Sequence, residues 1–244
     1  MKAMILAAGI GSRLRPVTEN IPKALVEVGG QTMLERTIHH LKHYGFDELI
    51  INIHHFAEKI KEHLARNQYF GADIKFSEEK SELLDTGGGL KQASWFFKED
   101  QSFLIHNVDV LSDFNLAKLW RFHQNKEALA TLVVQDRPTS RYLLFDEQNR
   151  LCGWENTRSG KKVLIHNKKT LRKLAFSGIH ITRSGIFEYM PDKDVFSIMD
   201  VYLKVAEKEK ILAYQDNESH WFDIGNLENL KKARSFILHQ NLGD

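Results

Sequence analysis

Glycine and basic residues gather near the start of the chain, directly after a short apolar run from Ala3 to Ala7. Gly9 and Gly11 lack the side-chain atoms that keep a ligand away from the backbone, so consecutive N–H groups can face anionic oxygens. Arg13 and Lys23 add positive charge, because a guanidinium binds phosphate through two parallel hydrogen bonds and an ammonium acts as a point charge. This combination predicts a strand followed by a loop that binds a polyphosphate.

Two familiar glycine loops do not fit this stretch. A P-loop needs a second glycine five positions after the first, and Leu14 stands there instead. The dinucleotide fingerprint matches only weakly, because the large Leu14 stands where its third glycine would allow close helix packing. A dinucleotide-dependent oxidoreductase stays open as an alternative, although it leaves Lys23 unexplained. A surface turn with solvated basic residues is the structural alternative.

The loop resembles the signature of sugar-1-phosphate nucleotidylyltransferases, in which a strand ending in Leu-Ala-Ala-Gly precedes Gly-x-Arg and then Pro-Lys. The matching residues are Leu6, Ala7, Ala8, Gly9, Gly11, Arg13, Pro16, Pro22 and Lys23. The resemblance implies that Leu6, Ala7, Ala8, Gly9 and Gly11 bind the nucleotide and that Arg13 and Lys23 are catalytic. The implied reaction converts an NTP and a sugar 1-phosphate into an NDP-sugar and pyrophosphate, with no covalent enzyme intermediate.

Two acidic residues match the positions at which this family binds metal. Asp109 ends the strand-like stretch Ile105–Val108, and Asp223 lies in a Trp-Phe-Asp-Ile-Gly segment followed by Asn226, where the family has a threonine. The resemblance implies that both hold Mg²⁺, which favours oxygen ligands and is commonly bound by one or two carboxylates plus substrate phosphates. Asp109 could instead cap the next helix, and Asp223 could be an ordinary turn residue.

Later motifs correspond to the parts of the family's site that bind the base and the sugar. Leu84–Gly89 resembles a Glu-Thr-Gly-Gly-Gly stretch of some uridylyltransferases, which assigns Gly87 and Gly88 to the nucleotide; a flexible helix entry is the alternative. The sugar would meet three further residues, namely Asn107, Glu155 and Gly178. Asn156 stands where many relatives have a phosphate-binding lysine, and the basic stretch Arg158–Lys173 is either its replacement or a solvated hairpin.

The features together look most like N-acetylmuramate 1-phosphate uridylyltransferases, which implies UTP and an amino-sugar 1-phosphate as substrates. Close relatives that use GTP with mannose or heptose 1-phosphate remain the alternative within the reaction class. A catalytically silent nucleotide-sugar sensor is the alternative outside it, although such a protein would lose the metal carboxylates.

The sequence alternates between strand-like and helix-like patterns, which predicts βα units that would position these residues. We expect an α/β fold with a Rossmann-like, mixed and mostly parallel sheet flanked by helices. A small antiparallel insertion would cover the sugar side. Expected strands are 3–7, 48–53, 102–108, 129–135, 142–145, 151–154 and 174–181. Expected helices are 32–44, 57–66, 88–97, 115–123, 198–208 and 227–238.

Composition sets further bounds on the chain. Its 244 residues, 42% of them apolar, suffice for one nucleotidylyltransferase domain over positions 1–244. The opening apolar run is too short for a membrane helix, and a net charge of +2 gives no reason to expect nucleic acid or a membrane surface. Cys152 is the only cysteine, which excludes internal disulfides. We expect a cytoplasmic monomer or small homo-oligomer.

Overall fold

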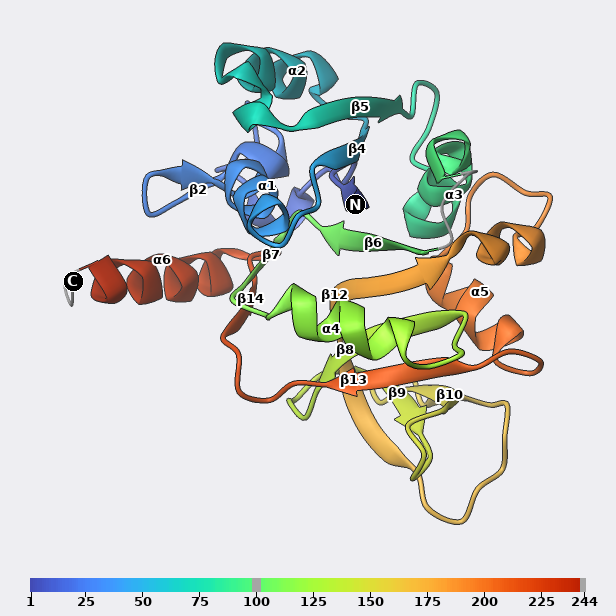
Figure 1. The fold of residues 1–244 in the computed structure, drawn as a ribbon. Coiled ribbons are helices and arrows are strands. Elements are labelled where there is room, and N and C mark those ends of the chain that lie inside the picture. Colours follow the sequence, from blue (N-terminus) through green and yellow to red (C-terminus); the bar gives the residue numbers. More distant parts are fainter. Residues whose placement is uncertain (98–101, 242–244) are drawn as a thin grey trace. The chain divides into compact units, whose positions relative to one another are not determined.

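The computed structural model describes residues 1–97 and 102–241, with side chains as far as residue 239. The chain divides into two compact units (Figure 1). The first comprises Met1–Leu83, His106–Phe114 and Ser219–Asp244, and the second comprises Leu84–Ile105 and Asn115–Glu218. The expected single domain over the whole chain stays a prediction.

Parallel strands form the sheet of the first unit. Strand β1 (Lys2–Leu6) pairs with β4 (Glu48–Ile53), and β4 pairs with β5 (Asp73–Glu78). The expected strands at 3–7 and 48–53 are confirmed. Strand β5 escapes the pattern analysis because its polar and apolar residues alternate, as in a strand exposed on one face, whereas β1 and β4 read as continuous apolar runs.

Helices and two short antiparallel strand pairs complete the first unit. Thr32 caps α1 (Met33–His43), since its Oγ1 accepts a hydrogen bond of 3.1 Å from the Glu35 amide. The other elements of this unit are α2 (Ala57–Arg66), α6 (Leu227–Asn241), β2 (Glu27–Val28) paired with β3 (Gln31–Thr32), β7 (Val110–Ser112) paired with β14 (Trp221–Asp223), and 3-10 turns at Ser12–Leu14, Lys23–Leu25 and Gln68–Gly71. The helices expected at 32–44, 57–66 and 227–238 are confirmed within a few residues.

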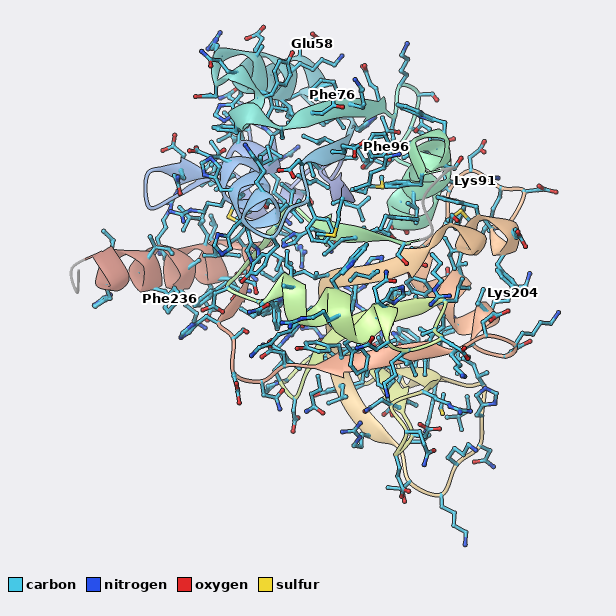
Figure 2. All side chains as sticks on the ribbon, viewed as in Figure 1. Glu58, Phe76, Lys91, Phe96, Lys204 and Phe236 are labelled. Carbon is cyan, nitrogen blue, oxygen red and sulfur yellow. The ribbon has the colours of Figure 1, made fainter. Side chains whose placement is uncertain are left out.

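The C-terminal helix α6 anchors the segments that carry the glycine loop. Its Leu230, Ala233 and Ile237 share one buried core with Leu14 from the loop and Ile224 that follows β14. Phe236, labelled in Figure 2, packs partly buried against the same core. Burying these side chains fixes the loop and the Asp223 segment on one apolar base.

Antiparallel pairing dominates the second unit. Strands β11 (Lys161–Leu164), β10 (Leu151–Asn156), β9 (Arg141–Phe145) and β12 (Arg172–Arg183) lie in that order. Strand β8 (Ala130–Gln135) pairs antiparallel with β12 and parallel with β13 (Ile211–Gln215). The expected antiparallel strands and the mixed sheet are confirmed. Strands β11 and β13 were not expected; β11 falls inside the basic stretch, where three of its four residues are exposed.

The described residues of the second unit form three α-helices, namely α3 (Asp85–Gln92), α4 (Leu116–Gln124) and α5 (Ile198–Val205). The helix expected over 88–97 is a shorter α-helix followed by a 3-10 turn, Ser94–Phe97. A further 3-10 segment spans Ser184–Tyr189. Strand β6 (Ser102–Asn107) begins in the second unit and ends in the first, close to its expected bounds. Throughout 1–97 and 102–241, the helices are too short or too polar to cross a bilayer.

Burial of His123 on α4 creates a pH-dependent contribution to stability. Its ring is fully buried, and Nδ1 hydrogen-bonds with Thr131 Oγ1 at 2.9 Å. Burial, aided by the nearby Arg183 cation, lowers the pKa of His123 from 6.5 to about 4. The unfolded chain therefore binds this proton more tightly, so stability is complete above pH 6.5 and falls as the pH drops towards 4.

We expect the free energy of unfolding to fall by about 2 kcal/mol more between pH 7 and pH 5 in the wild type than in His123→Gln. Urea denaturation at both pH values measures this difference. His239→Gln, which changes an exposed histidine on α6, serves as the control and should follow the wild type. Equal pH dependence in His123→Gln and the wild type would contradict the assignment.

Candidate active site

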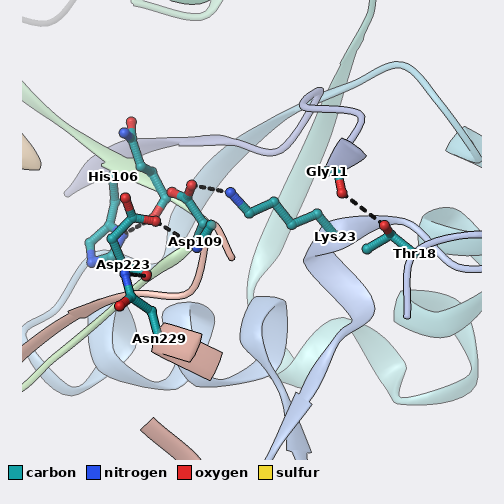
Figure 3. Close-up of polar contacts among 9 residues, drawn as sticks. Gly11, Thr18, Lys23, His106, Asp109, Asp223 and Asn229 are labelled. Atoms are coloured by element: carbon teal, nitrogen blue, oxygen red, sulfur yellow. Dashed lines mark hydrogen bonds and ion pairs between the residues drawn. The ribbon is translucent and has the colours of Figure 1, made fainter. Parts of the chain in front are cut away.

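The loop after β1 is held open by its glycines. A methyl carbon added at Gly9 would have no atom within 4 Å, so this position is free for a ligand. Gly11 has φ +70°, and an added carbon there would lie 3.1 Å from Lys23 Cβ. Thr18 Oγ1 donates a 2.8 Å hydrogen bond to the Gly11 carbonyl (Figure 3). Gly11 is therefore needed for the shape of the loop, and Gly9 for the space above it.

Lys23 and Asp109 form an ion pair within the first unit. The Lys23 Nζ donates to Asp109 Oδ2, as Figure 3 shows. The side chains are 10% and 23% exposed, so both charges are largely withdrawn from water. Lys23 opens a 3-10 turn after Pro22, and Asp109 follows directly after β6 and Val108, whose amide donates to Leu6 O at 3.1 Å. The glycine loop and the Asp109 carboxylate therefore follow the ends of two neighbouring strands, β1 and β6.

Pairing of β7 with β14 brings the second carboxylate to the first. Asp223 stands opposite Val110 in this antiparallel pair, and the Ile224 amide donates to Asp109 O at 3.0 Å. Asp223 Oδ1 accepts a 2.7 Å hydrogen bond from the Gly225 amide, and its carbonyl accepts one of 2.8 Å from Asn229 Nδ2. Two acids far apart in sequence therefore occupy neighbouring positions in the first unit.

Gly225 makes room for Arg13 beside Asp223. A methyl carbon at Gly225 would lie 3.0 Å from Arg13 Nη2 and 2.7 Å from Asp223 Oδ1. Any side chain at this position would displace one of the two groups. The glycine, the threonine Thr18 and the amide of Asn229 were not among the expected site residues, although Gly225 follows the motif that identified Asp223.

The residues present fit a divalent cation of the magnesium type. Asp109 and Asp223 offer hard carboxylate oxygens, and within the described residues no group of three or more His, Cys, Asp or Glu forms a complete protein cage. Mg²⁺ commonly takes one or two carboxylates and completes its shell with water and substrate phosphates. A two-carboxylate set therefore suits a metal that arrives with a phosphorylated ligand.

His106 lies beside these acids but carries no charge at neutral pH. Its Nδ1 donates to the Asn107 carbonyl at 2.9 Å, and burial together with the neighbouring His40 lowers its pKa to about 3. The side chain is 1% exposed. His106 therefore contributes packing and a neutral ring to this part of the first unit. Asn107, expected to contact the sugar, is half-buried at the end of β6.

Gly87 and Gly88 in the second unit are packed against the chain before α5. Both amides donate to the Phe196 carbonyl, at 2.9 and 3.2 Å. Added methyl carbons would lie 2.4 Å from the Phe196 ring at Gly87 and 1.9 Å from the Asp194 carbonyl oxygen at Gly88. Close packing of the backbone therefore explains why glycine is needed at both positions. Their role in nucleotide binding stays a prediction.

The two remaining sugar residues also lie in the second unit. Glu155 Oε1 accepts from Lys173 Nζ at 2.9 Å, and Lys173 belongs to the basic stretch that follows Asn156. Gly178 has φ +76° and interrupts the register between β12 and β8, so the strand bulges there. The structure thus places Arg13, Lys23, Asp109, Asp223 and the loop in one unit, and Gly87, Gly88, Glu155 and Gly178 in the other.

Gly9 borders open space, whereas Gly88 packs against another backbone segment, so substitutions at the two positions should have different effects. We expect Gly88→Ala to lower the free energy of unfolding by about 2–3 kcal/mol, because the new methyl group overlaps a backbone oxygen. Gly9→Ala should leave stability unchanged or slightly higher while it abolishes turnover, since the methyl group fills only the open space over the loop. Thermal melting and pyrophosphate release measure the two effects. A stable Gly88→Ala or a fully active Gly9→Ala would contradict this division.

Several proteins of known activity are similar in sequence to this chain. The chain is 28% identical, over 99% of its length, to a UTP–glucose-1-phosphate uridylyltransferase from Synechocystis sp. and covers 64% of that protein, just under two thirds. It is 29% identical to an N-acetylmuramate alpha-1-phosphate uridylyltransferase from Neisseria meningitidis, with 96% of this chain and 97% of the relative covered. A D-glycero-alpha-D-manno-heptose 1-phosphate guanylyltransferase from Campylobacter jejuni is also 29% identical, with 92% and 95% covered.

Solved structures confirm the fold. The crystal structure of HddC from Yersinia pseudotuberculosis complexed with GMP-PN superimposes with a TM-score of 0.76 at 22% identity, covering 96% of this chain and 98% of that one. The family model described as nucleotidyl transferase matches residues 2–240. Because this match takes in the glycine loop, both acidic residues and both compact units, the chain belongs to the nucleotidyl transferase family.

Proposed function

We propose that the protein transfers a nucleotidyl group from an NTP to a sugar 1-phosphate and releases pyrophosphate. The observation that carries this proposal is the convergence of Lys23, Asp109 and Asp223 beside a loop whose Gly9 is open to a ligand. A cation, two carboxylates and exposed backbone amides suit phosphoryl chemistry, which needs positioning and charge stabilisation more than covalent catalysis.

In this proposal the sugar-phosphate oxygen attacks the α-phosphorus in line, and pyrophosphate leaves on the opposite side. The loop from Leu6 to Gly11 binds the nucleotide through its backbone. Lys23 stabilises charge at the phosphates near the reacting centre, and Arg13 faces the departing pyrophosphate. Asp109 and Asp223 would hold Mg²⁺, which when bound neutralises phosphate charge.

For the substrates we favour UTP and N-acetylmuramate 1-phosphate. The Neisseria uridylyltransferase supports this choice because it matches the chain over nearly its full length. The Campylobacter guanylyltransferase has the same identity, so GTP with a manno-configured sugar 1-phosphate is the competing pair. These substrates are small and water-soluble, which agrees with the expected cytoplasmic location.

Removing either carboxylate should stop the reaction without unfolding the protein. We expect Asp109→Asn and Asp223→Asn each to lower kcat by about 100-fold or more, because charge stabilisation of the transition state weakens. Asp109→Asn should also lose a few degrees of melting temperature, since Lys23 loses its counter-ion. Steady-state kinetics and thermal melts measure both effects. Asp73→Asn, an exposed acid on β5, is the control, and near-normal turnover in both site variants would refute the assignment.

A substrate panel decides specificity. Pyrophosphate release is measured with four NTPs against N-acetylmuramate, mannose and heptose 1-phosphates, with and without a chelator. We expect the highest kcat/KM for UTP with the amino sugar and no turnover in the chelator until Mg²⁺ is restored. A higher kcat/KM for GTP with a manno-configured sugar would replace the substrate pair. No pyrophosphate release with any pair would reject the reaction itself.

A further inference from the structure

The carboxylates of Asp109 and Asp223 have different kinds of hydrogen-bond donor as partners. Asp109 is paired with the Lys23 ammonium, whereas Asp223 accepts a hydrogen bond from the Gly225 amide. Lys23 and Asp109 are both shielded from water, so neither charge could remain alone without a large loss of solvation. The ammonium therefore acts as the resident counter-ion of one of the two carboxylates proposed to hold metal.

The ammonium and a divalent cation compete for the same carboxylate. Two positive charges within a few ångströms of one another repel strongly at a site that is mostly out of water. The Lys23 backbone is fixed, since it opens a 3-10 turn and its Cβ packs against Gly11. Only its flexible four-carbon stem can move the charge, and the stem starts at the glycine loop proposed to bind the phosphates.

We propose that Lys23 exchanges Asp109 for the nucleotide's phosphates when Asp109 takes up the metal. When the Lys23 ammonium leaves, the Asp109 carboxylate is free to bind metal. When metal binds Asp109, the ammonium is free to bind phosphate. Metal and nucleotide consequently favour each other's binding, by the same factor in both directions. This inference rests on the proposed function for the identity of the nucleotide, but the competition between Lys23 and the metal does not require it.

Binding of Mn²⁺ alone, followed by electron paramagnetic resonance, tests the competition directly. We expect Lys23→Met to bind Mn²⁺ about fivefold or more tightly than the wild type, because the competing charge is gone. Lys23→Arg keeps a charge and should remain as weak as the wild type. Lys59→Met removes an exposed cation elsewhere in the first unit, where Nζ donates to the Asn20 carbonyl, and should not change Mn²⁺ affinity.

Binding of UTP in the presence of EDTA tests the other half of the exchange. Asp109→Asn releases Lys23 without any metal, whereas Asp223→Asn removes an equal negative charge but leaves the Lys23 pair intact. We expect UTP without metal to bind at least fivefold more tightly to Asp109→Asn than to Asp223→Asn. Circular dichroism at the assay temperature shows whether each variant is folded.

Two results would overturn the proposal. One is Mn²⁺ affinity in Lys23→Met equal to or below that of the wild type. If that variant is unfolded, Lys23→Gln supplies the same comparison. The other is equal UTP affinity in the two aspartate variants. The Mn²⁺ measurements use no nucleotide, so a failed substrate panel would reject the proposed function and leave this competition to be judged separately.

Discussion

The pairing of β7 with β14 is the contact on which the candidate site depends. It spans only three residues on each strand, yet it sets Asp223 opposite Val110 and ties the Ile224 amide to the Asp109 carbonyl. Helix α6 stabilises this pairing, because Ile224 packs in the same buried core as Leu230 and Ile237. The apolar face of the last helix thereby holds together the segments that carry two carboxylates far apart in the sequence.

Glycine serves four physical purposes among the residues discussed above. Gly11 adopts a positive φ, Gly9 leaves room for a ligand, and Gly225 lets a guanidinium approach a carboxylate. A fourth purpose appears at Gly87 and Gly88, which allow another backbone segment to pack closely and whose amides donate to its carbonyl. A run of glycines before a helix is therefore ambiguous by itself, since close approach of a ligand and close approach of the chain need the same residue.

Buried strands and amphipathic helices could be predicted from the sequence, because their residue patterns are clear. The runs in β1 and β4 are apolar on both faces, whereas β5 alternates and β11 is mostly exposed, so the latter two lack that pattern. The candidate site was predictable where one short segment carries it, as in Gly9 to Lys23. Its ion pair was not, because Lys23 and Asp109 meet only through the order of the strands. The packing of residues 194–196 against Gly87 and Gly88 could not be predicted for the same reason.

Under the exchange proposed for Lys23, charge balance gives a reason for metal and nucleotide to bind together. Arg13 and Lys23 offset Asp109 and Asp223, so the four side chains sum to no net charge. A triphosphate alone would bring negative charge against two carboxylates, and a metal alone would meet the Lys23 ammonium at Asp109. When the two arrive together each removes the obstacle to the other, since the metal screens the carboxylates and the phosphates receive the displaced ammonium. A loop lysine paired with a metal-type carboxylate is therefore poised for joint binding of both ligands.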